Sequence, residues 1–132
     1  EATKLAQVYQ DIVAMPQGFD TLIGEKGVSL SGGQKQLLNL ASVMAMQPEV
    51  LILDEPVTGL DPAASMELYE TIKDLNKKEN VTIIMVSHDI KNALNYATHI
   101  LHLEQENDFF GTVEEYKKSN VSNMFLGGVA ND

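Results

Sequence analysis

The chain has 132 residues, the size of one domain or of part of one. It carries 9 basic and 19 acidic side chains, a formal net charge of −10. Because nucleic-acid binding needs a basic surface, we expect no direct nucleic-acid role. The absence of cysteine excludes disulfides and thiolate metal sites. The sequence shows neither an apolar run near the roughly 20 residues of a membrane-spanning helix nor a signal-peptide pattern, so we expect a soluble, cytoplasmic chain.

The first half of the chain favours helices. Apolar residues at helical spacing predict an opening helix that ends at Pro16 and Gly18: Leu5, Val8, Tyr9, Ile12 and Val13. Residues 18–30 predict an irregular connection. Ser31, followed three positions later by Gln34, forms a capping-box pattern. It predicts the start of a largely buried helix that ends before Pro48.

A strand–helix–strand unit follows. Residues 50–53 are wholly apolar, which predicts a strand covered on both faces, as in a parallel sheet. Asp61 and Pro62 predict the start of the next helix. Residues 81–86 form a second apolar strand, so the segment reads as a right-handed βαβ unit.

Beyond this unit we expect a helix over about 89–97 and a strand over 99–103. A hairpin edge at 109–111 and a short helix capped by Thr112 and Glu115 complete the chain. The fold class is α/β, with a mainly parallel sheet flanked by helices.

Residues 31–34 form the first candidate site. Two glycines, Gly32 and Gly33, follow Ser31 at a helix N-terminus. There the helix dipole favours an anion, and the lack of Cβ atoms lets a phosphate approach closely. The structural alternative is a helix cap with no ligand.

The other candidates lie where the two strands end, the edge at which parallel sheets bind ligands. Asp54 and Glu55 can share the work of holding hydrated Mg²⁺ and polarising a water; an acidic loop start is the alternative. His88, within Ser87-His88-Asp89, can sense a terminal phosphate, or it can be a surface or packing residue.

In their order along the chain, these groups resemble the motifs of ABC ATPases. Leu30-Ser31-Gly32-Gly33-Gln34 is similar to the signature motif, and residues 51–56, Leu-Ile-Leu-Asp-Glu-Pro, to the Walker B motif. Gly59-Leu60-Asp61 is similar to the D-loop, and residues 87–89 to the H-switch. The resemblance covers residues from about 5 to 118. Residues 16–27 look exporter-like and residues 96–116 importer-like, which leaves cargo and direction open.

The resemblance implies a role for each matching residue. Asp54 would hold Mg²⁺ through water, and Glu55 would be the catalytic base. His88 would contact the γ-phosphate. The signature residues Ser31, Gly32, Gly33 and Gln34 would bind ATP held by the opposite subunit, and Asp61 would link the two active sites.

The resemblance also implies cofactors and partners. ATP and Mg²⁺ would be bound in a head-to-tail homo- or heterodimer of nucleotide-binding subunits. A transmembrane transporter subunit would hold the protein at the inner face of the membrane. Residues 1–47 would belong to the helical, signature-bearing subdomain, 48–118 to the α/β core, and 119–132 to a loosely held tail.

One departure from the family pattern matters most. The chain has no Gly-Lys pair, and therefore no P-loop lysine or amide cradle for phosphates. We also find no Q-loop and no adenine-stacking aromatic, so we expect a C-terminal portion that is inactive alone. Two alternatives are a truncated, non-hydrolysing interaction module and a non-transport ABC ATPase.

Overall fold

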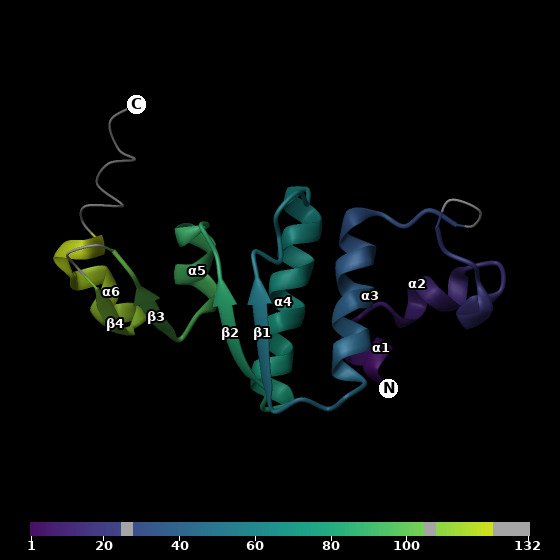
Figure 1. Ribbon diagram of the computed structural model, residues 1–132, viewed down its shortest axis with the longest axis horizontal. Helices are drawn as coiled ribbons and strands as arrows, with labels where there is room; N and C mark the ends of the chain where they lie inside the picture. The colour runs from purple at the N-terminus through teal and green to yellow at the C-terminus, as the bar shows by residue number, and fades with distance from the viewer. Residues whose placement is uncertain (25–27, 105–107, 123–132) are drawn as a thin grey trace. The chain divides into compact units, whose positions relative to one another are not determined.

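The structure is a computed structural model that describes residues 1–24, 28–104 and 108–122 (Figure 1). Two compact units, Glu1–Ser87 and His88–Asp132, are described separately below. Of the regions expected from the sequence, residues 25–27 before the signature and residues 123–132 of the tail lie outside the described part. Within that part, no helix combines the length and apolarity needed to span a membrane.

The first unit contains the helices and strands that carry most of the candidate residues. Its elements are α1 (Ala2–Leu5), α2 (Tyr9–Ala14), the 3₁₀ helix η1 (Gly18–Asp20), α3 (Gly32–Met44), β1 (Val50–Asp54), α4 (Pro62–Lys78) and β2 (Thr82–Val86). Strands β1 and β2 pair in parallel, with Leu51 opposite Ile83 and Asp54 opposite Val86. The predicted strand–helix–strand order with a parallel pair is therefore confirmed.

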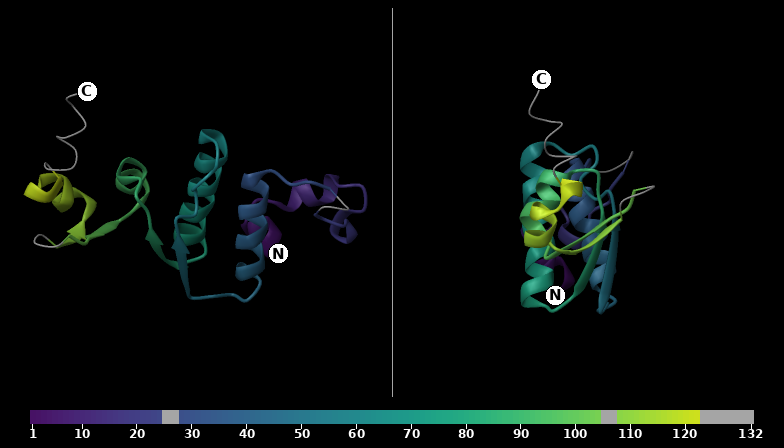
Figure 2. Two further views of the ribbon diagram at one scale, coloured as in Figure 1. Left: turned by 45° about the horizontal axis from the view of Figure 1, so that its top comes forward. Right: turned by 90° about the vertical axis from the view of Figure 1, so that its left-hand side faces the viewer.

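Helices α3 and α4 run in the same direction, opposite to the two strands (Figures 1 and 2). Their N-terminal ends consequently lie at the end of the unit where β1 and β2 finish. This orientation follows from the connections, because each helix is joined at one end to β1. It brings two helix starts and two strand ends to one end of the first unit.

The core of this unit forms where the helices pack on the strands. Leu51 on β1 and Leu75 on α4 are 4% and 1% exposed, and both belong to one apolar cluster. The other buried members of the cluster are Ala6, Val8, Ile12, Leu37, Leu40, Ala41, Met44, Leu68, Ile72 and Val81. Helix α4 packs its buried positions at the three- and four-residue spacing of an amphipathic helix.

The prediction that β1 is covered on both faces is wrong. Ile52 is 68% exposed and Ile84 on β2 is 52% exposed, whereas Leu51 is buried. An apolar hollow of about 260 Å³ runs along residues 50–53 and reaches Leu40 of α3. An apolar run is compatible with burial of both faces of a strand. The described residues of this unit, however, cover only one face of β1.

The prediction of a single opening helix is also wrong. The chain forms two short helices, α1 and α2, separated at Gln7, whose φ of 58° is left-handed. The residues on either side, Ala6 and Val8, are 0% and 2% exposed. The break therefore lets both neighbours enter the core, a tertiary gain that helical periodicity does not reveal.

The second unit pairs a hairpin with a helix. Its elements are α5 (Ile90–Tyr96), β3 (His99–His102), β4 (Phe109–Thr112) and α6 (Val113–Lys118), and β3 and β4 are antiparallel. Tyr116 is 1% exposed, and its ring meets Phe109 edge-on at 5.2 Å between centroids. Its hydroxyl is hydrogen-bonded to Nδ1 of His102 at 3.0 Å, so His102 has a packing role here. Burial raises the pKa of Tyr116, and the Glu104 carboxylate adds to the effect.

Helix α6 begins with the predicted capping box. The Thr112 hydroxyl and amide donate to Oε2 of Glu115 at 2.7 and 2.8 Å, and the Glu115 amide donates back to the hydroxyl at 3.3 Å. These two donors to the carboxylate lower the pKa of Glu115 below its ordinary value. The cap therefore favours the charged form of this side chain.

We predict that α6 loses stability in acid through Glu115. Because the pKa is lower in the folded state, the contribution is present above the unfolded value, about 4.3, and is lost as pH falls through the folded value. Carboxyl titration by NMR should place the pKa of Glu115 below the ordinary value for a glutamate, and Glu115→Gln should remove the acid loss. Glu114→Gln is the matched control, because Glu114 lies in the same helical turn and forms an exposed ion pair with Lys117 at 3.4 Å. A pKa of Glu115 at or above the ordinary value for a glutamate would contradict the prediction.

Candidate functional site

The turn at residues 31–34, here called the signature turn, starts helix α3. The Ser31 hydroxyl oxygen accepts from the Gln34 amide at 3.1 Å, and the Gln34 side-chain oxygen accepts from the Ser31 amide at 3.1 Å. This confirms the predicted capping box. Ser31 and Gly32 are exposed, whereas Gly33 is buried. The serine is accordingly open to a ligand, and the second glycine belongs to the packed interior.

A second turn, at residues 59–61, starts helix α4. Oδ1 of Asp61 accepts from the amides of Ala63 and Ala64, both at 3.0 Å, and Pro62 occupies the first helical turn, as predicted. Gly59 has a φ of +78°, a conformation that other residues rarely adopt. Asp61 is exposed, so one of its oxygens holds the helix start while the side chain remains at the surface.

The two turns touch through their small residues. A Cβ added to Gly33 would lie 2.9 Å from the Cβ of Ala64 and 3.8 Å from its Cα. A Cβ added to Gly32 would lie 3.1 Å from Cδ2 of Leu60. The structure therefore brings the signature turn and the Asp61 turn together, and glycine at 33 is what allows the helices to approach so closely.

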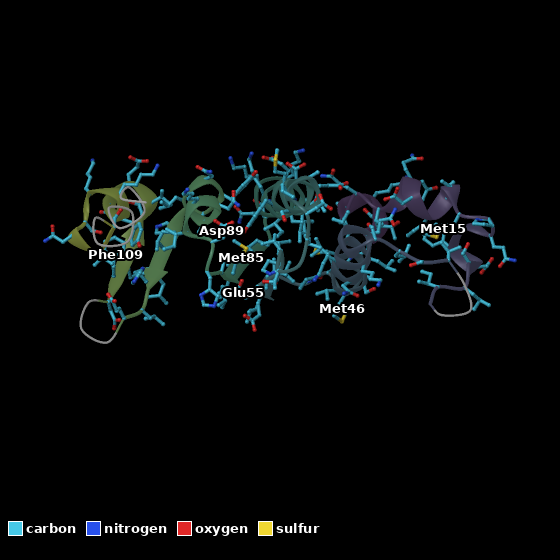
Figure 3. The ribbon with its side chains drawn as sticks, turned by 90° about the horizontal axis from the view of Figure 1, so that it is seen from above. Met15, Met46, Glu55, Met85, Asp89 and Phe109 are labelled. Atoms are coloured by element: carbon cyan, nitrogen blue, oxygen red, sulfur yellow. The ribbon has the colours of Figure 1, made fainter. Side chains whose placement is uncertain are left out.

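Asp54 and Glu55 lie where β1 ends. Asp54 is the last residue of the strand and is exposed, and the amide of Glu55 continues the pairing by donating to the carbonyl of Val86 at 3.0 Å. Figure 3 views the chain from the end where both strands finish and labels Glu55 there. The Thr58 hydroxyl donates to Oε2 of Glu55 at 3.3 Å. The strand pairing and this contact both constrain the glutamate.

The backbone of Glu55 is unusual. Its φ of +46° is left-handed, which is uncommon outside glycine, asparagine and aspartate. Such a conformation costs about 1–3 kcal/mol and often accompanies functional residues. It bends the chain directly from β1 into the turn that leads to Gly59. The carboxylate is thereby placed at the strand end and not along the sheet face.

Asp54 and Glu55 carry carboxylate oxygens, the type of ligand that Mg²⁺ prefers. Among residues 1–24, 28–104 and 108–122, no three His, Asp or Glu side chains gather as a ligand set. Mg²⁺ in phosphoryl-transfer sites usually takes one or two carboxylates, with water and phosphate oxygens completing its shell. Asp54, exposed at the strand end, can supply one such oxygen directly or through water.

His88 belongs to the second unit, of which it is the first residue. It is exposed, and the following Asp89 caps α5 by accepting from the Asn92 amide at 3.1 Å. Since the two units are described separately, the grouping of His88 with Asp54 and Glu55 stays a prediction.

Two residues of this region escaped the sequence analysis. Thr58 follows Glu55 by three positions in a polar turn, a spacing that could have suggested its hydrogen bond to the carboxylate. Ala64 gave no local signal, because its contact with Gly33 spans about thirty residues of chain.

Comparison with known proteins identifies relatives of the chain. Residues 28–92 match the family model described as "AAA domain, putative AbiEii toxin, Type IV TA system". The energy-coupling factor transporter ATP-binding protein EcfA2 of Enterococcus faecalis is 41% identical over 105 residues, 80% of this chain and 35% of that protein. EcfA2 of Clostridioides difficile is 46% identical over 96 residues, 72% of this chain and 33% of the relative.

A relative whose name indicates a different role is the multidrug resistance-like ATP-binding protein MdlA of Buchnera aphidicola. It is 37% identical over 95 residues, which are 72% of this chain and 16% of that protein. The chain spans about a third of the length of the EcfA2 relatives that it matches. By the order of its motifs and by these matches, the chain is similar to the ATP-binding proteins of ABC transporters.

Proposed function

We propose that the chain is the signature-bearing portion of an ATP-hydrolysing subunit that drives an ABC transporter. The observation that carries the proposal is the meeting of the signature turn, the Asp61 turn and the end of β1 at one end of the first unit. The same residues stand in the motif order of the ABC ATPases, which the chain resembles. Residues 1–47 would be part of the helical subdomain and residues 48–118 part of the α/β core.

The signature turn is suited to contact a terminal phosphate. The Ser31 oxygen accepts from the Gln34 amide, so its own O–H remains able to donate to a phosphate oxygen. First-turn amides of a helix have no intrahelical acceptor, and the dipole there favours negative charge. In a head-to-tail dimer, the Ser31 hydroxyl and the Gly33 backbone amide would contact the γ-phosphate of ATP bound to the opposite subunit.

The carboxylates would act on the nucleotide of their own subunit. Mg²⁺, when bound, would neutralise charge on the β- and γ-phosphates. Asp54 would hold that ion through water, and Glu55 would orient and deprotonate the attacking water. The contacts of Glu55 with Val86 and Thr58 help to fix its position. His88 would contact the γ-phosphate, and Asp61 would link the two sites across the dimer.

The partners follow from this role. A second nucleotide-binding subunit would complete each ATP site. A transmembrane subunit, contacted at the inner face of the membrane, would be driven by ATP hydrolysis in this dimer. A non-hydrolysing module is the second candidate, favoured by one observation: these 132 residues contain no Gly-Lys pair. Such a module would still offer Ser31 and Gly33 to a complete partner.

We predict that the isolated chain shows no measurable MgATP binding by calorimetry. In P-loop proteins the amide cradle and its lysine make the main contacts with the phosphates of the nucleotide. Neither is encoded in this sequence. A chimaera in which the chain replaces the matching third of the Enterococcus faecalis relative should bind MgATP. Micromolar binding by the isolated chain would mean that the phosphate site has been misplaced.

In that chimaera, Ser31→Ala should weaken ATP-dependent dimerisation, measured by analytical ultracentrifugation. The loss of the cap alone costs about 1 kcal/mol of helix stability, so a control must remove a comparable cap elsewhere. Thr112→Ala serves, because Thr112 caps α6 by the same capping-box arrangement. Equal dimerisation of the two variants would remove Ser31 from the nucleotide contact.

Glu55→Gln in the chimaera should abolish turnover and preserve MgATP binding. Removing a general base costs about 10²–10⁴-fold in rate, while the amide keeps the size and most hydrogen bonds of the side chain. Glu49→Gln is the matched control, because Glu49 is exposed and lies just before the opposite end of β1. Steady-state phosphate release measures the effect. Turnover within twofold of the parent would take Glu55 out of the base role.

A further inference from the structure

Ala64 contacts both turns of the site. Its amide donates to Oδ1 of Asp61 at 3.0 Å, and its Cβ faces the backbone of Gly33. A side chain at 33 would meet the Cβ of Ala64 at 2.9 Å, closer than real Cβ contacts. One residue of α4 therefore joins the start of α3 to the carboxylate that starts α4.

The contact at Gly33 cannot be relieved by a rotamer change. The facing atoms are the Cβ and Cα of Ala64, which move only with the backbone of α4. A local shift of the backbone at Ala64 also displaces the amide that donates to Oδ1 of Asp61. The neighbouring Gly32 differs, since its added Cβ would meet only Cδ2 of Leu60, the end of a flexible side chain, at 3.1 Å.

We propose that Ala64 is a positioning residue that, with Gly33, fixes the signature turn against the Asp61 turn. This rests on the proposed function, which gives Ser31 a nucleotide contact and Asp61 an interface contact. Because the two turns share one close contact, the nucleotide-facing hydroxyl and the interface carboxylate move together. Gly33 then serves the fold as well as the ligand.

The direction of a stability change separates this role from simple helix propensity. Alanine is the better helix former, so Gly33→Ala would stabilise α3 if space were available. Overpacking against Ala64 acts in the opposite direction and outweighs that gain. Ala64→Gly removes the facing Cβ and should restore the space.

The experiment is a double-mutant cycle on the full chain, without nucleotide. Gly33→Ala should lower Tm by at least about 5 °C, and the same change in an Ala64→Gly background should lower it by less than half as much. Gly32→Ala is the control and should shift Tm by less than half of the Gly33→Ala effect. An unchanged or raised Tm for Gly33→Ala would overturn the proposal.

A second readout tests positioning as distinct from packing. The Ala63 amide also donates to Asp61, at 3.0 Å, and is present in every variant. The chemical shift of the Ala63 amide should change in Gly33→Ala relative to the parent chain. In the double variant it should match the chemical shift found in Ala64→Gly alone. A signal unmoved by Gly33→Ala would overturn the proposal.

If Gly33→Ala fails to fold, a folded double variant supports the proposal and an unfolded one overturns it. Since the cycle needs no nucleotide, its failure is separate from a failure of the dimerisation test with Ser31→Ala.

Discussion

The first unit depends on the parallel pairing of β1 with β2. The register places Asp54 opposite Val86, and the Glu55 amide adds one more bond beyond the strand. Parallel strands need a crossover, so α4 must return from the end of β1 to the start of β2. The return puts Asp61 at the end where the strands finish. The crossover through α4 therefore explains why Asp54 and Glu55 lie near the start of α4.

Features specified within a few residues of the chain were predictable. Ser31 with Gln34, Asp61 with Pro62, and Thr112 with Glu115 each satisfy helix-end amides locally, and the structure contains all three helix starts. Asp54, Glu55 and His88 were also found locally, as polar side chains after apolar strands. Their chemical identity needed only the sequence, whereas their mutual placement needed the connections between elements.

Features decided by distant residues were not predictable. The break at Gln7 exists because Ala6 and Val8 both enter a core that later helices and strands complete. The exposure of Ile52 depends on which elements reach the outer face of β1, and an apolar run carries no such information. The closeness of Gly33 to Ala64 is a tertiary fact. A glycine pattern can predict a phosphate site. It does not reveal that one of the glycines, Gly33, is also required for the contact between α3 and α4.

The left-handed backbone at Glu55 has a consequence for engineering. Glycine would adopt that φ at little conformational cost, so a variant with glycine at 55 would fold more readily at this turn while lacking the carboxylate. Selection for thermal stability alone would therefore favour sequences that lack a carboxylate at position 55, where β1 ends. Selection for heat resistance and selection for turnover should pull this position in opposite directions.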